Sequence, residues 1–141
     1  MGAIHPNEDE VRAFLAEAED GPIIMINLLR YREKAEYPEG SDEAPCTGQE
    51  AYGRYSDAVM PLLAGVGGRP VFVGLARQSL IAPEGEAWDQ AILVEYPSRK
   101  AFIEMTTSAA YLAVAHHRTA ALADSRLIAT SGAVIPPPAA S

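Results

Sequence analysis

The segment Ser108–Ile128, which reads SAAYLAVAHHRTAALADSRLI, constrains the fold most strongly. It begins with an alanine-rich helical pattern that carries His116, His117 and Arg118 on its third turn, and it continues into a strand through Asp124–Ser125. A helix that ends in two histidines and an arginine has two interpretations. It is either a folding element docked on a sheet or the wall of a small-molecule pocket.

Helical and strand patterns alternate along the rest of the chain. Asn7 caps a first helix that reaches Asp20, and the run Ile23–Tyr31 is too short for a buried helix and rich in β-formers, so we predict a central strand there. The next element expected is a helix over Gln49–Ala64, which Pro61 should kink. Two strands, over Arg69–Ala82 and Ala87–Tyr96, should follow, joined by a compact turn at Pro83–Glu86. The last elements expected are a short helix containing Phe102 and Met105, the helix from Ser108, and a strand over Leu127–Val134. The order is helix, then β-α-β-β-α-β. It predicts an α+β, ferredoxin-like fold, with a four-stranded antiparallel sheet and both crossover helices on one face.

The two faces of the strand Ile23–Tyr31 differ in polarity. One is purely apolar and should face the helices: Ile24, Ile26 and Leu28. The other contains an amide, which often indicates a cavity: Met25, Asn27, Leu29 and Tyr31. The sequence alone leaves open which parity lines a pocket.

One face of such a sheet has no helix to cover it. The strands carry so many apolar side chains that part of this face must be apolar, and an exposed apolar patch of several hundred Å² is unusual on a monomer. A two-fold dimer packed sheet against sheet would cover the patch and enclose the space between the sheets. We therefore expect a homodimer.

Length and charge exclude several classes of protein. A chain of 141 residues fits one domain, expected over residues 1–135 with a flexible Pro/Ala tail over 136–141. The formal net charge of −8 disfavours nucleic acid and membrane surfaces as partners. The single Cys46, the lack of an apolar run of about 20 residues and the lack of a signal-like N-terminus favour the cytoplasm.

Four stretches of the chain resemble a known family. They read INLLRYRE, YGRYSDAVMPLL, EAWDQAILVEYPSRKAF and HRTAALADSRLIAT, and across Gly21–Thr130 they resemble the domain of unknown function 1330 family (DUF1330). The resemblance implies a dimeric alpha-beta barrel. It implies no particular activity, because the wider superfamily includes cofactor-independent monooxygenases, muconolactone-isomerase-like enzymes, haem-dependent proteins and stress-responsive proteins.

The histidine pair is the first candidate for chemistry. Adjacent residues of a helix point about 100° apart, and no histidine or cysteine stands three or four positions away, so we expect no metal site and no cofactor. His116 shares a stripe with Leu112 and lies nearer the predicted buried face, so it is the candidate general base. The competing interpretation is that His116, His117 and Arg118 simply meet the negative end of the helix dipole.

Further candidates lie on the strands. Asn27 needs a hydrogen-bond partner, which could be a ligand, a water or a neighbour such as Arg77. Arg77 could anchor an anion, and an aromatic ring with a polar tip suits a pocket wall or an interface. We expect the ligand-binding set to comprise Arg77, Trp88, Gln90, Tyr55, His117 and Arg118.

Two hypotheses about function remain open at this point. In the first, a homodimer binds a compact small molecule, as a cofactor-independent oxygenase or isomerase in which Asn27 orients the substrate and His116 moves a proton. In the second, the dimer is not an enzyme, and the same polar residues only satisfy one another and the interface. The alternative includes structural and stress-responsive roles.

Overall fold

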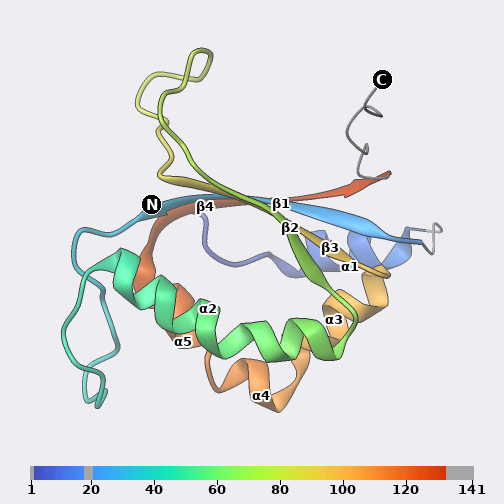
Figure 1. The fold of residues 1–141 in the computed structure, drawn as a ribbon, viewed down its shortest axis with the longest axis horizontal. Helices are drawn as coiled ribbons and strands as arrows, with labels where there is room; N and C mark the ends of the chain where they lie inside the picture. The colour runs from blue at the N-terminus through green and yellow to red at the C-terminus, as the bar shows by residue number, and fades with distance from the viewer. Residues whose placement is uncertain (1, 18–20, 133–141) are drawn as a thin grey trace, which may run out of the picture.

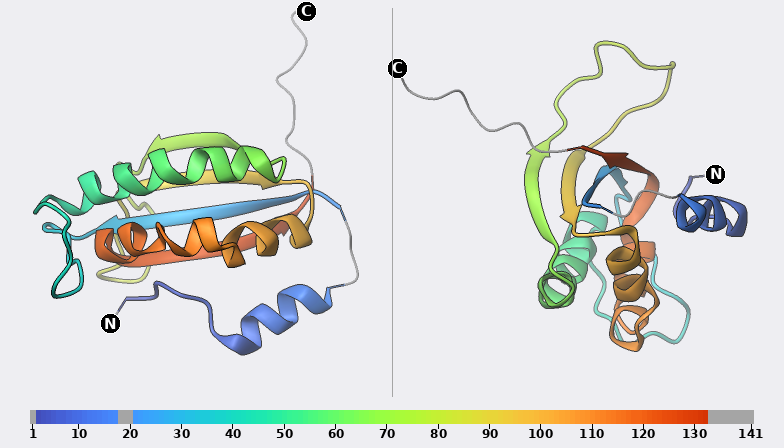
Figure 2. Two further views of the ribbon diagram at one scale, coloured as in Figure 1. Left: turned by 90° about the horizontal axis from the view of Figure 1, so that it is seen from below. Right: turned by 90° about the vertical axis from the view of Figure 1, so that its right-hand side faces the viewer.

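The computed structural model describes residues 2–17 and 21–132, and it has the predicted α+β, ferredoxin-like architecture (Figure 1). Its elements are α1 (Glu8–Ala16), β1 (Ile23–Tyr31), α2 (Gly48–Gly65), β2 (Arg69–Leu75), β3 (Gln90–Tyr96), α3 (Arg99–Thr107), α4 (Ala109–Leu112), α5 (Ala115–Ala121) and β4 (Leu122–Ser131). The strands form one antiparallel sheet in the order β2-β3-β1-β4. Helices α2 to α5 cover one face and leave the other open, while α1 lies beyond the β4 edge (Figure 2).

Side-chain caps start several of the helices, including the Asn7 cap that the sequence predicts. The Asn7 side chain accepts from the backbone N–H of Glu10 at the start of α1, and Thr47 forms a complete capping box with Glu50 at the start of α2. Ser98 and Ser108 cap α3 and α4 in the same way. Helix α1 ends at Ala16, and the predicted extension to Asp20 runs into residues outside the described part.

The faces of β1 are the reverse of our expectation. Met25 and Leu29 belong to the core between sheet and helices, and Tyr31 packs against it, whereas Ile26 and Leu28 lie on the open face. The prediction was wrong because purely apolar side chains suit a face that a partner covers as well as one that helices cover. Asn27 therefore points toward the helices.

The hairpin between β2 and β3 is longer and less regular than predicted. Strand β2 ends at Leu75 and β3 begins at Gln90. The last hydrogen bond between the two segments runs from the Ala76 N–H to the Asp89 carbonyl. The predicted turn at Pro83–Glu86 is present, but the two arms leading to it are not strands. The result is a projecting arm, residues 76–89, that extends away from the helices on the open side of the sheet (Figure 1).

The predicted long helix from Ser108 is broken. It splits at Val114 into α4 and α5, so His116 and His117 lie in the first turn of α5 rather than at the C-terminal end of a helix. The interpretation through the negative end of the helix dipole is therefore wrong for them. Strand β4 also begins at Leu122, earlier than the expected Leu127, and the end of the predicted strand lies outside the described residues.

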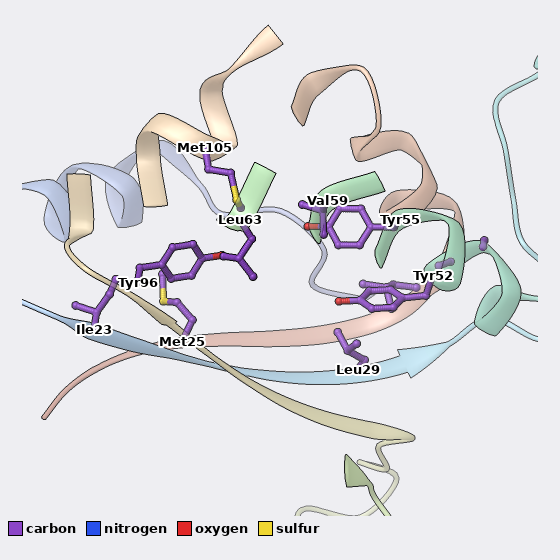
Figure 3. Packing of buried hydrophobic residues seen from close by; sticks show 12 residues of the cluster. Ile23, Met25, Leu29, Tyr52, Tyr55, Val59, Leu63, Tyr96 and Met105 are labelled. Carbon is purple, nitrogen blue, oxygen red and sulfur yellow. The ribbon is translucent and has the colours of Figure 1, made fainter. Parts of the chain in front are cut away.

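The core between the sheet and the helices is unusually rich in tyrosine. Leu29 and Leu122 are fully buried in it, and Tyr52, Tyr55 and Tyr96 each keep less than a tenth of their surface exposed. In Figure 3 the rings of Tyr52 and Tyr96 enter from opposite ends, with their hydroxyls directed inward. Within the described residues, no helix is both long and apolar enough to cross a membrane.

Candidate functional site

Five polar side chains from three separate segments meet at one end of the helical layer. We call Tyr37, Glu43, Arg54, His116 and His117 the histidine cluster. A Glu43 carboxylate oxygen, Oε1, lies 3.5 Å from His116 Nε2 and 3.8 Å from His117 Nε2. The Tyr37 hydroxyl is 2.7 Å from His117 Nδ1 and accepts a bond from Arg54 Nη1 at 3.2 Å. Arg54 also contacts the second Glu43 oxygen, Oε2, at 3.4 Å.

Backbone hydrogen bonds hold the long loop between β1 and α2 against α5. The N–H groups of Arg32 and Glu36 donate to the carbonyls of Ala121 and Ala120, at 2.8 and 2.9 Å. At the end of the loop, Gly48 approaches the backbone so closely that a Cβ would lie 2.2 Å from the Arg32 carbonyl oxygen, so only glycine fits. These bonds fix the course of the long loop, which brings Tyr37 and Glu43 to the two histidines.

The two histidines differ in burial, in the opposite sense to our prediction. The side chain of His117 is 12% exposed and that of His116 is 38% exposed. Burial and the neighbouring His116 lower the pKa of His117, against the opposing pull of Glu43. Burial raises the pKa of Tyr37. His117 is thus the more buried ring and is oriented by the Tyr37 hydroxyl, while His116 is open to solvent.

A second polar group lies inside the core. We call Tyr52, Tyr55, Tyr96, Tyr111 and Arg118 the tyrosine cluster. The hydroxyls of Tyr55 and Tyr111 are 2.9 Å apart and share a hydrogen bond. Burial raises the pKa of Tyr52, Tyr55 and Tyr96, and the positive charge of Arg118 partly offsets the rise at each of them.

The N-terminal segment lies against the outer side of Arg118. The Arg118 guanidinium donates to the Ile4 carbonyl at 2.9 Å, the Ala3 N–H donates to Asp124, and the Ser125 hydroxyl donates to the Ala3 carbonyl. None of the ion pairs found among residues 2–17 and 21–132 pairs Arg118 with a carboxylate. Arg118 is therefore a half-buried cation whose direct partner is a neutral carbonyl.

The other predicted site residues do not converge. Asn27 donates to the backbone carbonyls of Met25 and Ile92, at 3.5 and 3.3 Å, rather than meeting Arg77. Arg77 is exposed on the projecting arm, because β2 ends before it. Gln90 lies on the helix face and its side chain bonds the Tyr31 hydroxyl.

Trp88 lies at the base of the projecting arm, between two arginines. The guanidinium of Arg126 lies 5.0 Å from its ring centroid and that of Arg30 lies 6.0 Å away. Asp124 and Glu86 pair with these arginines, so their charges are balanced locally. Of the predicted site residues, His116 and His117 lie together in the histidine cluster, and Tyr55 and Arg118 lie together in the tyrosine cluster. Trp88 and Arg77 belong to neither cluster. The catalytic and ligand-binding roles stay predictions.

Sequence reasoning missed Tyr37, Glu43 and Arg54. Only the unusual length of the loop between β1 and α2 signalled that its polar side chains had a role.

The chain matches the family described as Domain of unknown function (DUF1330) over residues 43–133. It belongs to this family. The resemblance seen in the sequence is thereby confirmed, and it leaves the activity open. Among curated proteins, no sequence matches the chain.

Solved structures extend the likeness across almost the whole chain. The RPA0582 protein of unknown function from Rhodopseudomonas palustris is 38% identical, with a TM-score of 0.87, over 96% of this chain and 100% of that one. The methylated RPA0582 protein gives 39% identity and a TM-score of 0.86 over 96% and 97% of the two chains. A dimeric protein of unknown function with a ferredoxin-like fold from Bacteroides fragilis is 17% identical, with a TM-score of 0.50, over 79% and 97%. That last likeness concerns the fold alone.

Proposed function

We propose that this protein is a homodimer that binds a small organic anion beside Arg118, within the tyrosine cluster. The observation that carries the proposal is the half-buried guanidinium of Arg118, which lies among tyrosine hydroxyls without a carboxylate partner in the described structure. A partly buried cation without a counter-ion is less well solvated than an exposed one, and a bound anion would offset that cost. The planar fork of arginine suits a carboxylate in particular.

The surroundings of Arg118 favour an aromatic carboxylate. Tyrosine rings offer apolar faces for stacking, and their hydroxyls offer hydrogen bonds at the polar end of the ligand. Tyrosine hydroxyls are protonated at neutral pH, and burial raises the pKa of Tyr55 and Tyr96 further, so both can donate to an anion. Such a site suits the substrate of a cofactor-independent isomerase or oxygenase, which is the reaction class that we propose.

Ligand-induced thermal stabilisation tests the proposal. The probes are benzoate and 4-hydroxybenzoate, which should raise the melting temperature of the native protein by mass action. Arg118→Gln should lose this shift, while the matched control Arg12→Gln, an exposed arginine on α1, should keep it. Failure of both probes to stabilise the native protein, or an equal shift in Arg118→Gln, would contradict the proposal and leave the non-enzymatic dimer as the better account.

The open face of the sheet supports the homodimer. Phe72 and Ile128 lie there with 54% and 49% of their surfaces exposed. The projecting arm leaves the sheet on the same side and carries Leu80 and Ile81, which are 85% and 98% exposed. Exposed apolar groups of this number on one side are typical of an interface. The Bacteroides fragilis protein with the same fold is also described as dimeric.

Sedimentation velocity tests the dimer. The native protein should sediment as a dimer at micromolar concentration, and Phe72→Glu combined with Ile128→Glu should yield monomers. Leu112→Glu is the control, because Leu112 is 63% exposed but belongs to α4 on the helical side. A monomeric native protein, or a dimer lost equally in the control, would contradict an interface through the open face.

A further inference from the structure

The exposed rim of the histidine cluster has the donor set of a transition-metal site. One ligand atom each from Glu43, His116 and His117 lies within 4.8 Å of the other two. Two imidazoles and one carboxylate are the donors that zinc and ferrous sites with open coordination positions use. From this geometry we propose that Glu43, His116 and His117 bind a divalent first-row transition-metal ion.

The distances fit such an ion with little movement. Metal–ligand bonds of about 2.0–2.1 Å in a tetrahedral arrangement place the ligand atoms roughly 3.4 Å apart. The Glu43 oxygen is 3.5 Å from His116 Nε2 and 3.8 Å from His117 Nε2, so two of the three edges already have nearly the required length. The two imidazole nitrogens lie within 4.8 Å of each other, so the third edge would close by a rotation of the more exposed His116 ring.

The two adjacent histidines both reach the Glu43 carboxylate because their rings lie side by side and the carboxylate approaches from another segment. Their ring centroids are 4.1 Å apart and their planes differ by 35°, so the rings lie close together. Both occupy the first turn of α5, just after the break at Val114, and the carboxylate comes from the loop rather than from the helix. The expectation of diverging rings was wrong, because the direction of the Cβ atoms does not determine where a long side chain ends.

Outer contacts orient the ligands as metal sites require. A ligating histidine usually donates its other ring N–H to an oxygen, and the Tyr37 hydroxyl lies 2.7 Å from His117 Nδ1 to receive it. Arg54 donates to the Tyr37 hydroxyl and lies 3.4 Å from the Glu43 oxygen that faces away from the histidines.

The site is distinct from the proposed anion site. None of its three ligands belongs to the tyrosine cluster, and both Glu43 and His116 keep about a third of their side chains exposed, so an ion can enter from solvent. Positions not filled by protein would be taken by water or by a small anionic ligand.

Metal titration of tag-free, chelator-treated protein tests the inference. Co²⁺ should bind at one equivalent per protomer with visible absorption bands, and calorimetry should show Zn²⁺ competing for the same site. Glu43→Gln and His116→Gln should each abolish binding in the titrated range, and Tyr37→Phe should weaken it about 10–100-fold. His5→Gln is the matched control, because His5 is the one other histidine of the chain.

Each result has a defined meaning. Binding that is absent in the native protein, unchanged in Glu43→Gln, or lost in His5→Gln would overturn the site. Circular dichroism of the metal-free variants separates loss of ligand from loss of fold, and Glu43→Gln decides the matter if a histidine variant unfolds, since Glu43 lies on a loop and not in the core. Arg118→Gln should leave metal binding unchanged, which keeps this test independent of the proposed anion site.

Discussion

The hydrogen bond between Tyr55 and Tyr111 allows a quantitative test of how the core is held together. The two hydroxyl oxygens are 2.9 Å apart, and Tyr55 is 8% exposed. Tyr111→Phe should lower the free energy of unfolding by about 1–3 kcal/mol, because it leaves the buried Tyr55 hydroxyl without its partner. Tyr55→Phe should cost less, since the half-buried Tyr111 hydroxyl can turn to water.

The double variant carries the decisive information. Once either hydroxyl is gone the bond is lost, and the double variant also removes the Tyr55 hydroxyl that Tyr111→Phe leaves unpaired, so it should cost no more than Tyr111→Phe alone. The coupling free energy expected from the double-mutant cycle is about 1 kcal/mol, the net contribution of one such bond. Coupling of this size would mean that the two hydroxyls satisfy one another in the resting protein, so that a ligand using Tyr55 must first break this bond.

Urea unfolding provides the assay, followed by far-ultraviolet circular dichroism and by the fluorescence of the single tryptophan, Trp88. Protein concentration must be the same for all variants, because the stability of a dimer depends on it. Tyr55→Phe combined with Tyr37→Phe is the control pair, expected to be additive within about 0.5 kcal/mol. Additive effects of Tyr55→Phe and Tyr111→Phe would refute the reasoning.

Three further predictions concern stability. Leu29→Ala should cost about 2–5 kcal/mol in urea unfolding because Leu29 is fully buried, whereas Leu112→Ala, at an exposed position, should cost about 0.5 kcal/mol or less. Thr47→Ala should cost about 0.5–2 kcal/mol through loss of the α2 capping box, and Thr47→Ser should restore most of it. The lowered pKa of His117 means that the folded state binds fewer protons than the unfolded state, so its contribution to stability is complete above a pH of about 6.5 and declines as the pH falls below that. His117→Gln should therefore flatten the loss of stability between neutral and mildly acidic pH, and an unchanged slope would contradict this.

Local patterns were enough to predict the order of the elements. A helix cap depends on neighbouring residues alone, and Asn7 caps α1 as expected, just as Ser98 and Ser108 cap α3 and α4. The run Ile23–Tyr31 is a central strand with the predicted bounds. From these elements the chain order leads to the ferredoxin-like sheet, because few arrangements place β-α-β-β-α-β strands in one compact layer.

The faces of the sheet could not be assigned in the same way. Both sets of β1 side chains are mostly apolar, since the helices bury one and the other lies on the open face, so composition does not distinguish them. What decides the matter is the set of large partners on α2, where Tyr52 and Tyr55 pack against Met25 and Leu29. That packing depends on residues more than twenty positions away, and no window of the sequence contains both sides of it.

The candidate sites depended even more on distant contacts. Tyr37 and His117 are 80 positions apart and yet hydrogen-bonded, and Arg54 reaches the same hydroxyl from a third segment. Helical spacing around His116 gave no sign of Glu43, because Glu43 comes from a loop that backbone hydrogen bonds hold against α5, and such bonds leave no side-chain pattern in the sequence. Loops of this length are uncommon unless they have a role. Asking which far segment a long polar loop could reach would therefore have been a better guide to Glu43 than the spacing of the histidines themselves.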